Sequence, residues 1–109
     1  MKKTALLITV SLALAAGTAV AADAKDNWVK NCQKCHGADG KGQTVMGKKL
    51  KVKDYTDAKV QDAFKDEEAF KITKEGKKEG DKEAMPAYAE KLSDQEIKDL
   101  VAFVRKFKK

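Results

Sequence analysis

Histidine and proline each occur once in this chain of 109 residues, and cysteine occurs only twice. Both cysteines and the histidine stand close together, as Cys32, Cys35 and His36. A structural zinc site normally takes four cysteine or histidine ligands, so these three residues do not complete one. A disulfide between Cys32 and Cys35 would close too short a loop to add much stability. The scarcity of these residues therefore argues against a domain stabilised by zinc or by disulfides.

The spacing of Cys32, Cys35 and His36 is that of the C-x-x-C-H motif, at which c-type haem is attached. The two thiols of such a motif add across the two vinyl groups of one haem, and the imidazole that follows binds the iron. A thioredoxin-like dithiol would need a βαβ pattern around the cysteines, and the sequence contains none. We therefore predict one covalent haem c on Cys32 and Cys35, with His36 as the first iron ligand.

The sequence has only one long apolar run, residues 5–16, which follows the basic pair Lys2 and Lys3. The run is shorter than the ~20 apolar residues that a membrane-spanning helix needs. A short basic region, an apolar run and then small residues are typical of a secretory signal peptide. We predict that residues 1–22 are such a peptide.

Cleavage is expected after Ala21 or Ala22, which leaves residues 23–109 as one small domain in the periplasm. No cysteine stands at the cleavage point, so we expect no lipid anchor and no membrane anchor in the mature form. A domain of this size rarely buries enough apolar surface to be stable alone. We expect the haem to serve as a large apolar element of its core.

The charge balance does not indicate a nucleic-acid partner. The chain has 23 Lys and Arg against 17 Asp and Glu. Loss of Lys2 and Lys3 with the signal peptide lowers the formal net charge from +6 to +4. The two propionates of a haem would lower it further, to about +2. Nucleic-acid binding requires a stronger basic excess.

No stretch of useful length alternates apolar and polar residues as a half-buried strand does, so we predict an all-α fold. Helical spacing of apolar residues predicts helices over residues 24–34 and 67–75, and a helix between them that is capped by Thr56 or Asp57 and runs to about Lys65. The helix over residues 67–75 should end at Gly76. The glycine-rich stretch at residues 37–42 is predicted to be a turn close to the haem.

The C-terminal helix has the clearest start in the sequence. Ser93 and Glu96 are spaced as a capping box, and Leu92 and Ile97 are spaced to pack across it as a hydrophobic staple. The charged residues 74–83, which precede this region, are predicted to be a solvated loop. An apolar stripe then continues along the helix through Ile97, Leu100, Val101, Val104 and Phe107.

With a single histidine in the chain, the second iron ligand must be another type of residue. The mature part contains two methionines, Met46 and Met85. Methionine is more often a core residue than a ligand. Met85, however, is followed by the only proline, Pro86, which fixes φ and stiffens the loop. We favour Met85, whose thioether would raise the reduction potential relative to a second histidine.

These motifs together resemble a small bacterial monohaem class I cytochrome c. The resemblance is carried by the haem motif, residues 85–88 and residues 92–105, and it covers essentially the whole mature domain. One departure is the lack of a proline between His36 and Met85, because family members usually carry one whose carbonyl steadies the proximal histidine. We expect a backbone carbonyl near residues 48–50 to replace it, or else a more loosely held imidazole.

The resemblance implies that helices at the two ends of the domain cross, with shorter helices and loops wrapped around one covalent haem. Trp28 on the first helix should meet Leu100 and Phe103 on the last. Ala24 would be the small residue at the crossing.

The resemblance also implies a soluble periplasmic one-electron carrier with His/Met ligation. Both axial positions would be filled, so we expect a monomeric carrier for redox partner proteins and not an enzyme. One alternative is a five-coordinate haem sensor or small haem catalyst in which Met85 does not bind, and another is a domain detached from a larger oxidoreductase.

Two lysine clusters would flank the exposed haem edge if the likeness holds, and would favour partners with acidic docking surfaces. The second cluster is interleaved with acidic residues and is as easily explained as solvated surface. The first lysine cluster is Lys48, Lys49, Lys51 and Lys53; the second lysine cluster is Lys74, Lys77, Lys78 and Lys82.

Overall fold

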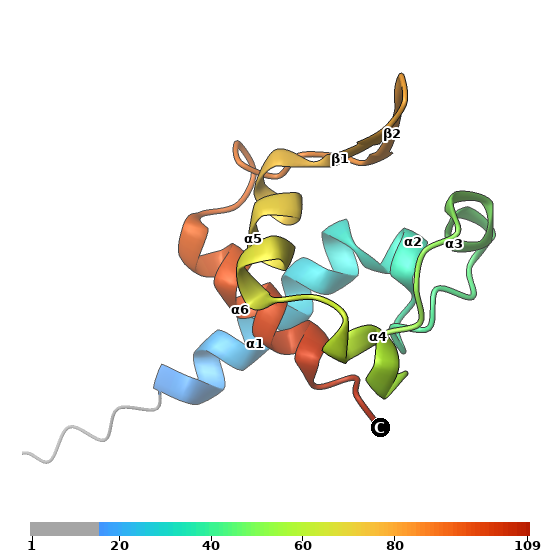
Figure 1. The fold of residues 1–109 in the computed structure, drawn as a ribbon. Helices are drawn as coiled ribbons and strands as arrows, with labels where there is room; N and C mark the ends of the chain where they lie inside the picture. Colours follow the sequence, from blue (N-terminus) through green and yellow to red (C-terminus); the bar gives the residue numbers. More distant parts are fainter. Residues whose placement is uncertain (1–15) are drawn as a thin grey trace, which may run out of the picture.

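The computed structural model describes residues 16–109, with side chains from residue 23 onward, and the predicted signal peptide lies largely outside this part of the chain. Six α-helices and one two-stranded antiparallel sheet follow one another in the described part (Figure 1). This confirms the predicted all-α class, to which the structure adds a small sheet. In chain order the elements are α1 (Ala16–Asn31), α2 (Gln33–His36), α3 (Val45–Leu50), α4 (Ala58–Asp62), α5 (Asp66–Glu75), β1 (Lys77–Glu79), β2 (Lys82–Met85) and α6 (Asp94–Arg105).

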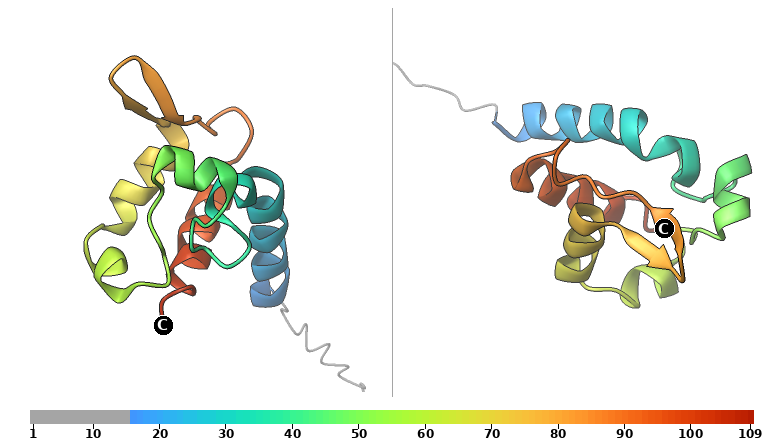
Figure 2. Two further views of the ribbon diagram at one scale, coloured as in Figure 1. Left: turned by 90° about the vertical axis from the view of Figure 1, so that its right-hand side faces the viewer. Right: turned by 90° about the horizontal axis from the view of Figure 1, so that it is seen from above.

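The first and last helices, α1 and α6, pack against each other and carry five of the eight buried hydrophobic residues (Figure 2). Ala24 and Trp28 on α1 are each only 3% exposed. The ring centroids of Trp28 and Phe103 lie 5.6 Å apart, and Leu100 belongs to the same buried cluster as Trp28. The predicted crossing is therefore confirmed, and the small Ala24 lets the two helices approach closely.

The start of α6 confirms the predicted capping box. The Glu96 backbone N–H donates to Ser93 Oγ at 3.1 Å, and the Ser93 backbone N–H donates to Glu96 Oε1 at 3.0 Å. Leu92 and Ile97 are both buried, as a hydrophobic staple requires. The Ser93 backbone N–H and the Asn27 side-chain amide both donate to the Glu96 carboxylate and lower its pKa, because they favour the charged form.

Several helix boundaries differ from the predictions. The predicted helix over residues 24–34 is divided, since α1 ends before Cys32 and α2 begins after it. Helix α4 is shorter than predicted and ends at Asp62. No helix is predicted at α3, which begins where Thr44 Oγ1 accepts a hydrogen bond from the Gly47 backbone N–H at 2.8 Å. Helix α3 has only six residues, of which three are exposed, so it lacks the apolar periodicity by which longer helices are predicted.

The charged stretch predicted as a loop is largely a β-hairpin, formed by β1 and β2. Its register places Lys78 opposite Glu83 and Glu79 opposite Lys82. Cross-strand pairs of opposite charge stabilise such a ribbon, although they give no apolar alternation in the sequence. The hairpin projects from the body of the molecule beyond the end of α5 (Figure 1).

Gln61 on α4 is a buried polar side chain, 2% exposed, that joins three parts of the fold. Its Nε2 donates to the Tyr55 carbonyl at 2.7 Å and to the Val104 carbonyl at 2.9 Å. Its Oε1 accepts from Arg105 Nη1 at 3.0 Å, and Arg105 Nη2 donates to the Phe64 carbonyl at 2.8 Å. These bonds hold α4 and the segment after it against α6.

We expect Gln61→Leu to lower the free energy of unfolding by about 2 kcal/mol, because buried carbonyls and the Arg105 guanidinium would lose their partner. Urea unfolding of the haem-loaded protein, followed by circular dichroism, measures this change. Gln95→Ala is the matched control, since it removes only an exposed hydrogen bond to Asp99 of 3.0 Å. The control should change stability by less than about 0.5 kcal/mol. Equal effects of the two substitutions would contradict the role assigned to Gln61.

Candidate haem-binding site

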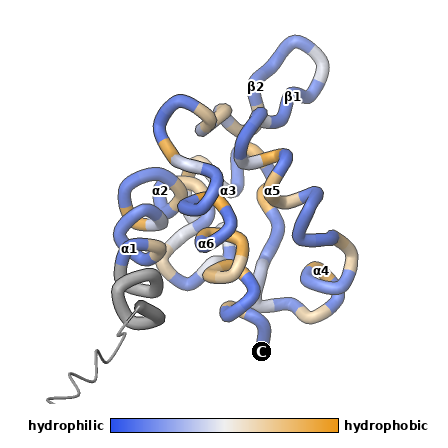
Figure 3. The backbone as a smooth tube through the Cα atoms, turned by 90° about the vertical axis from the view of Figure 1, so that its left-hand side faces the viewer, coloured by the Kyte–Doolittle hydropathy of each residue, from blue (hydrophilic) through white to orange (hydrophobic). Residues whose placement is uncertain are grey.

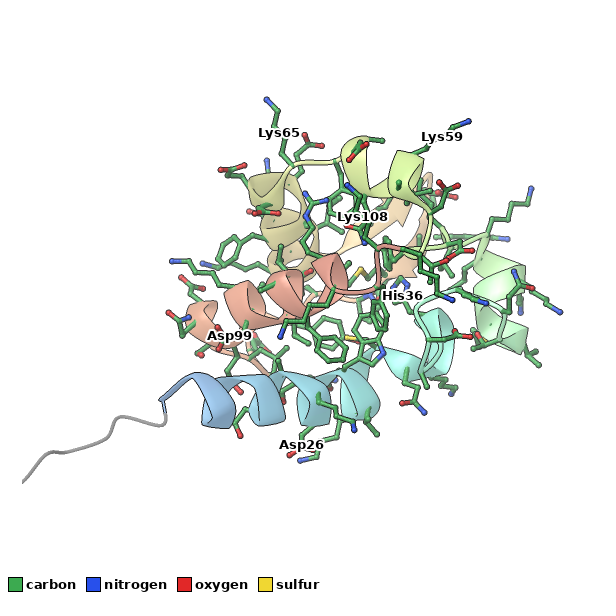
Figure 4. All side chains as sticks on the ribbon, turned by 90° about the horizontal axis from the view of Figure 1, so that it is seen from below. Asp26, His36, Lys59, Lys65, Asp99 and Lys108 are labelled. Carbon is green, nitrogen blue, oxygen red and sulfur yellow. The ribbon has the colours of Figure 1, made fainter. Side chains whose placement is uncertain are left out.

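The four residues predicted to form the site, Cys32, Cys35, His36 and Met85, line one cavity. Met46, on α3, does not line it. Figure 4 shows His36 in the interior, whereas the labelled side chains of Lys59 and Lys65 point away from the molecule. Most of the other lining side chains are apolar and come from α5, α6 and the segments around α3 and α4, among them Leu50, Val52, Phe64, Ala69, Ile72, Leu100, Val101 and Val104.

The two cysteines and the histidine are held on a single helical turn. The backbone N–H groups of Cys35 and His36 both donate to the Cys32 carbonyl, at 3.2 and 2.9 Å. The carbonyl of Gly37, the residue after this turn, accepts a buried hydrogen bond of 3.0 Å from Trp28 Nε1. The motif is thus fixed by its own backbone and by the tryptophan one turn before it.

Helix α3 packs directly on the backbone of the motif. Thr44 Oγ1 donates to the Cys35 carbonyl at 2.7 Å. A Cβ atom at Gly47 would collide with the carbonyl oxygens of Cys35 and Gly42, so only glycine permits this approach. The close contact explains why α3 contains a glycine, for which no role is predicted from the sequence.

The imidazole of His36 is enclosed by aromatic rings. Its centroid lies 5.6 Å from that of Trp28 and 5.3 Å from that of Tyr55, whose ring stacks on it with an interplanar angle of 26°. His36 Nδ1 is buried and has no hydrogen-bond partner within the described residues. The predicted acceptor carbonyl near residues 48–50 is therefore wrong. Without that hydrogen bond, the imidazole is held by packing against the two rings, which is the looser arrangement that the missing proline allowed. Burial lowers the pKa of His36, which favours the neutral form that binds a metal.

Both cysteines are free thiols. Burial, together with the nearby Cys35, raises the pKa of Cys32 to about 12. A reactive dithiol of the thioredoxin type needs a lowered thiol pKa, so the environment argues against that alternative.

Met85 lies at the end of β2, in a segment that is held against the end of α5. The Tyr88 backbone N–H donates to the Thr73 carbonyl at 3.0 Å. Gly76, which ends α5 with a φ of +80°, lies so close that a Cβ atom there would come within 2.8 Å of the Met85 carbonyl oxygen and 2.9 Å of the Ala87 nitrogen. Glycine is needed at this position both for its φ and for the approach.

These residues fit a covalently bound haem. Two thiols, the imidazole of His36 and a thioether line one mainly apolar cavity. In residues 23–109, no group of three or more His, Cys, Asp and Glu side chains is placed to hold a metal ion. A fold of this kind with this set of residues defines a c-type cytochrome domain.

Comparison with known proteins gives the same result. The family described as "Cytochrome C oxidase, cbb3-type, subunit III" matches residues 19–104, and the chain belongs to this family of cytochrome c domains. The structure is similar to that of KustC0563 c-type cytochrome, with a TM-score of 0.69 and 36% identity over 80% of this chain and 99% of that chain. A mutant of Kustc0563 is similar with a TM-score of 0.69 and 35% identity over 79% of this chain and 99% of that chain. No curated protein compared matches the chain.

The predicted likeness to a small class I cytochrome c is thus confirmed. The chain is a haem-binding electron carrier with covalently bound haem c, and it acts with redox partner proteins. In the part of the chain that the structure describes, no helix is both long and apolar enough to span a membrane.

Proposed function

We propose that residues 23–109 form a soluble periplasmic one-electron carrier with its haem on Cys32 and Cys35 and with His36 and Met85 as the iron ligands. The observation that carries this proposal is that all four side chains line one mainly apolar cavity. Met46 does not line it, which favours Met85 as the thioether ligand.

The residues around the cavity suit a carrier better than an enzyme. The bound haem supplies a one-electron redox couple. His36 and Met85 would fill both axial positions, so no open position would remain for a small-molecule substrate. The apolar lining limits access of water, and the thioether of Met85 would raise the reduction potential. The carrier therefore needs no substrate pocket beyond the haem site.

The N-terminal sequence supports the periplasmic location that we propose. Residues 1–22 have the basic start, apolar run and small residues of a cleaved signal peptide. The family match begins at residue 19, close to the proposed start of the mature domain. Free thiols at Cys32 and Cys35 would be available for haem attachment after export.

We further propose that the first lysine cluster docks acidic surfaces of redox partners. All four of its lysines are exposed, two of them line the cavity, and none forms an ion pair with the described residues. In the second lysine cluster, Lys74 pairs with Asp94 at 3.1 Å and Lys77 with Glu79 at 4.0 Å. Figure 3 shows the hairpin as hydrophilic along most of its length, but its charges are of both signs.

We expect the mature protein to exceed its polypeptide mass by one haem, because two thioether bonds hold the group. Intact mass spectrometry and acid-acetone extraction check this, and the colour should remain with the protein. Cys35→Ser should retain one bond, whereas the double variant with Cys32→Ser should lose the haem on extraction. Release of haem from the unsubstituted protein would refute covalent attachment.

We expect Met85→Ala to leave the haem attached, to lower the reduction potential and to let the ferrous protein bind carbon monoxide, since the iron would lose its thioether. Met46→Ala is the matched control. It should also keep the haem attached, but it should neither lower the potential nor let the ferrous protein bind carbon monoxide. A redox titration and carbon monoxide difference spectra measure both effects. Faster carbon monoxide binding by the Met46 variant alone would reverse the assignment. Binding by the unsubstituted protein as fast as by Met85→Ala would favour the five-coordinate alternative.

We expect electron-transfer rates to an acidic partner to fall about tenfold or more as ionic strength rises, because salt screens the attraction to exposed lysines. Lys→Glu changes in the first lysine cluster should weaken the dependence more than the same changes in the second, whose lysines already have acidic neighbours. Stopped-flow rates over a salt series provide the measurement. A flat salt dependence would leave the first cluster without a docking role.

A further inference from the structure

Tyr88 connects the segment that carries Met85 to the segment that carries the haem motif. Its hydroxyl donates to the Asn31 carbonyl at 2.8 Å, across 57 positions of sequence. Asn31 ends α1 and immediately precedes Cys32, and Tyr88 follows Met85 by three residues. The tyrosine is 7% exposed and its side chain lines the cavity.

The hydroxyl fills a gap in the backbone hydrogen bonding of α1. In a continuous helix the Asn31 carbonyl would accept from the Cys35 backbone N–H. Cys35 instead donates to the Cys32 carbonyl at 3.2 Å, because the chain turns into α2. The Asn31 carbonyl thus depends on Tyr88 as its donor, and an unpaired buried carbonyl would be costly.

The end of α5 and strand β1 hold the Met85 segment from its other side. The backbone N–H groups of Tyr88 and Ala89 donate to the carbonyls of Thr73 and Lys74, at 3.0 and 3.1 Å. Among the hydrogen bonds of residues 85–89 described here, the Tyr88 hydroxyl makes the one that reaches α1. Phenylalanine would bury the same ring, so the bond is the specific contribution of tyrosine at this position.

We propose that Tyr88 is a positioning residue that keeps the Met85 thioether at the iron by fixing the Met85 segment to the backbone before Cys32. The inference rests on the proposed role of Met85 as a ligand. Tyr88 touches neither the thioether nor the iron in this account, and acts by limiting how far the segment can move. Opening the segment requires the bond to Asn31 to break, so the bond sets part of the barrier to loss of the thioether.

The test is Tyr88→Phe in the haem-loaded protein, with intact mass confirming one haem in every variant. Met85 must leave before carbon monoxide can bind, so the binding rate of the ferrous protein reports opening of the segment. We expect the rate to rise about tenfold, which corresponds to ~1.4 kcal/mol and is in the range of one buried hydrogen bond. The weak near-infrared band of methionine-ligated ferric haem should also disappear at a lower temperature than in the unsubstituted protein.

Asn27→Ala is the matched control. Asn27 Nδ2 donates to Glu96 Oε2 at 3.1 Å, so this substitution removes a bond between α1 and α6 without touching the Met85 segment. It should lower the unfolding temperature but leave the carbon monoxide rate within about twofold of the unsubstituted protein. A Tyr88→Phe rate that is unchanged, or raised no more than that of Asn27→Ala, would overturn the inference.

The experiment also distinguishes failure of the positioning role of Tyr88 from failure of the proposed ligation by Met85. If Met85 is not a ligand, the unsubstituted protein lacks the near-infrared band and binds carbon monoxide without delay. If Met85 is a ligand but Tyr88 does not position it, the band is present and only the Tyr88→Phe result is negative.

Discussion

The fold depends on a core whose buried side chains surround a cavity and so do not pack only against one another. Only eight hydrophobic residues are buried in the described part of the chain, and several of them, including Trp28, Cys32, Tyr88 and Leu100, also line the cavity. So small a set of buried side chains contributes little stability by packing alone. Bound haem supplies the missing apolar contacts, so cofactor and fold depend on each other as metal and fold do in small metal-binding domains.

Trp28 couples the crossing of α1 and α6 to the haem motif. Its ring centroid lies 5.6 Å from that of Phe103, 5.1 Å from that of Phe107 and 5.6 Å from that of His36, while its Nε1 donates to the Gly37 carbonyl. One side chain thus contacts the terminal helix, the histidine and the backbone after it. A change in how α1 and α6 pack would therefore alter the surroundings of the histidine.

The sequence predicts those parts of the molecule whose signals are local. The capping box at Ser93, the stop at Gly76 and the haem motif each depend on residues a few positions apart, and the structure bears out the first two. Helix α3 and the hairpin are missed because tertiary contact and strand pairing stabilise them and apolar periodicity does not. The role of Gln61 is not predicted either, because it depends on a tertiary contact with Arg105, which lies 44 positions away.

The hydrogen-bond acceptor expected for His36 is missing for a different reason. Related proteins usually have a proline whose carbonyl accepts this bond, and this chain has no proline between His36 and Met85. A hydrogen bond from the second nitrogen of a ligating imidazole fixes its orientation and raises its basicity. Here the rings of Trp28 and Tyr55 hold the orientation by packing, and Nδ1 has no acceptor among the described residues. In the proposed site, such an imidazole donates less electron density to the iron. The weakly donating thioether of Met85 acts in the same direction, so both ligands would favour the reduced state and a high reduction potential.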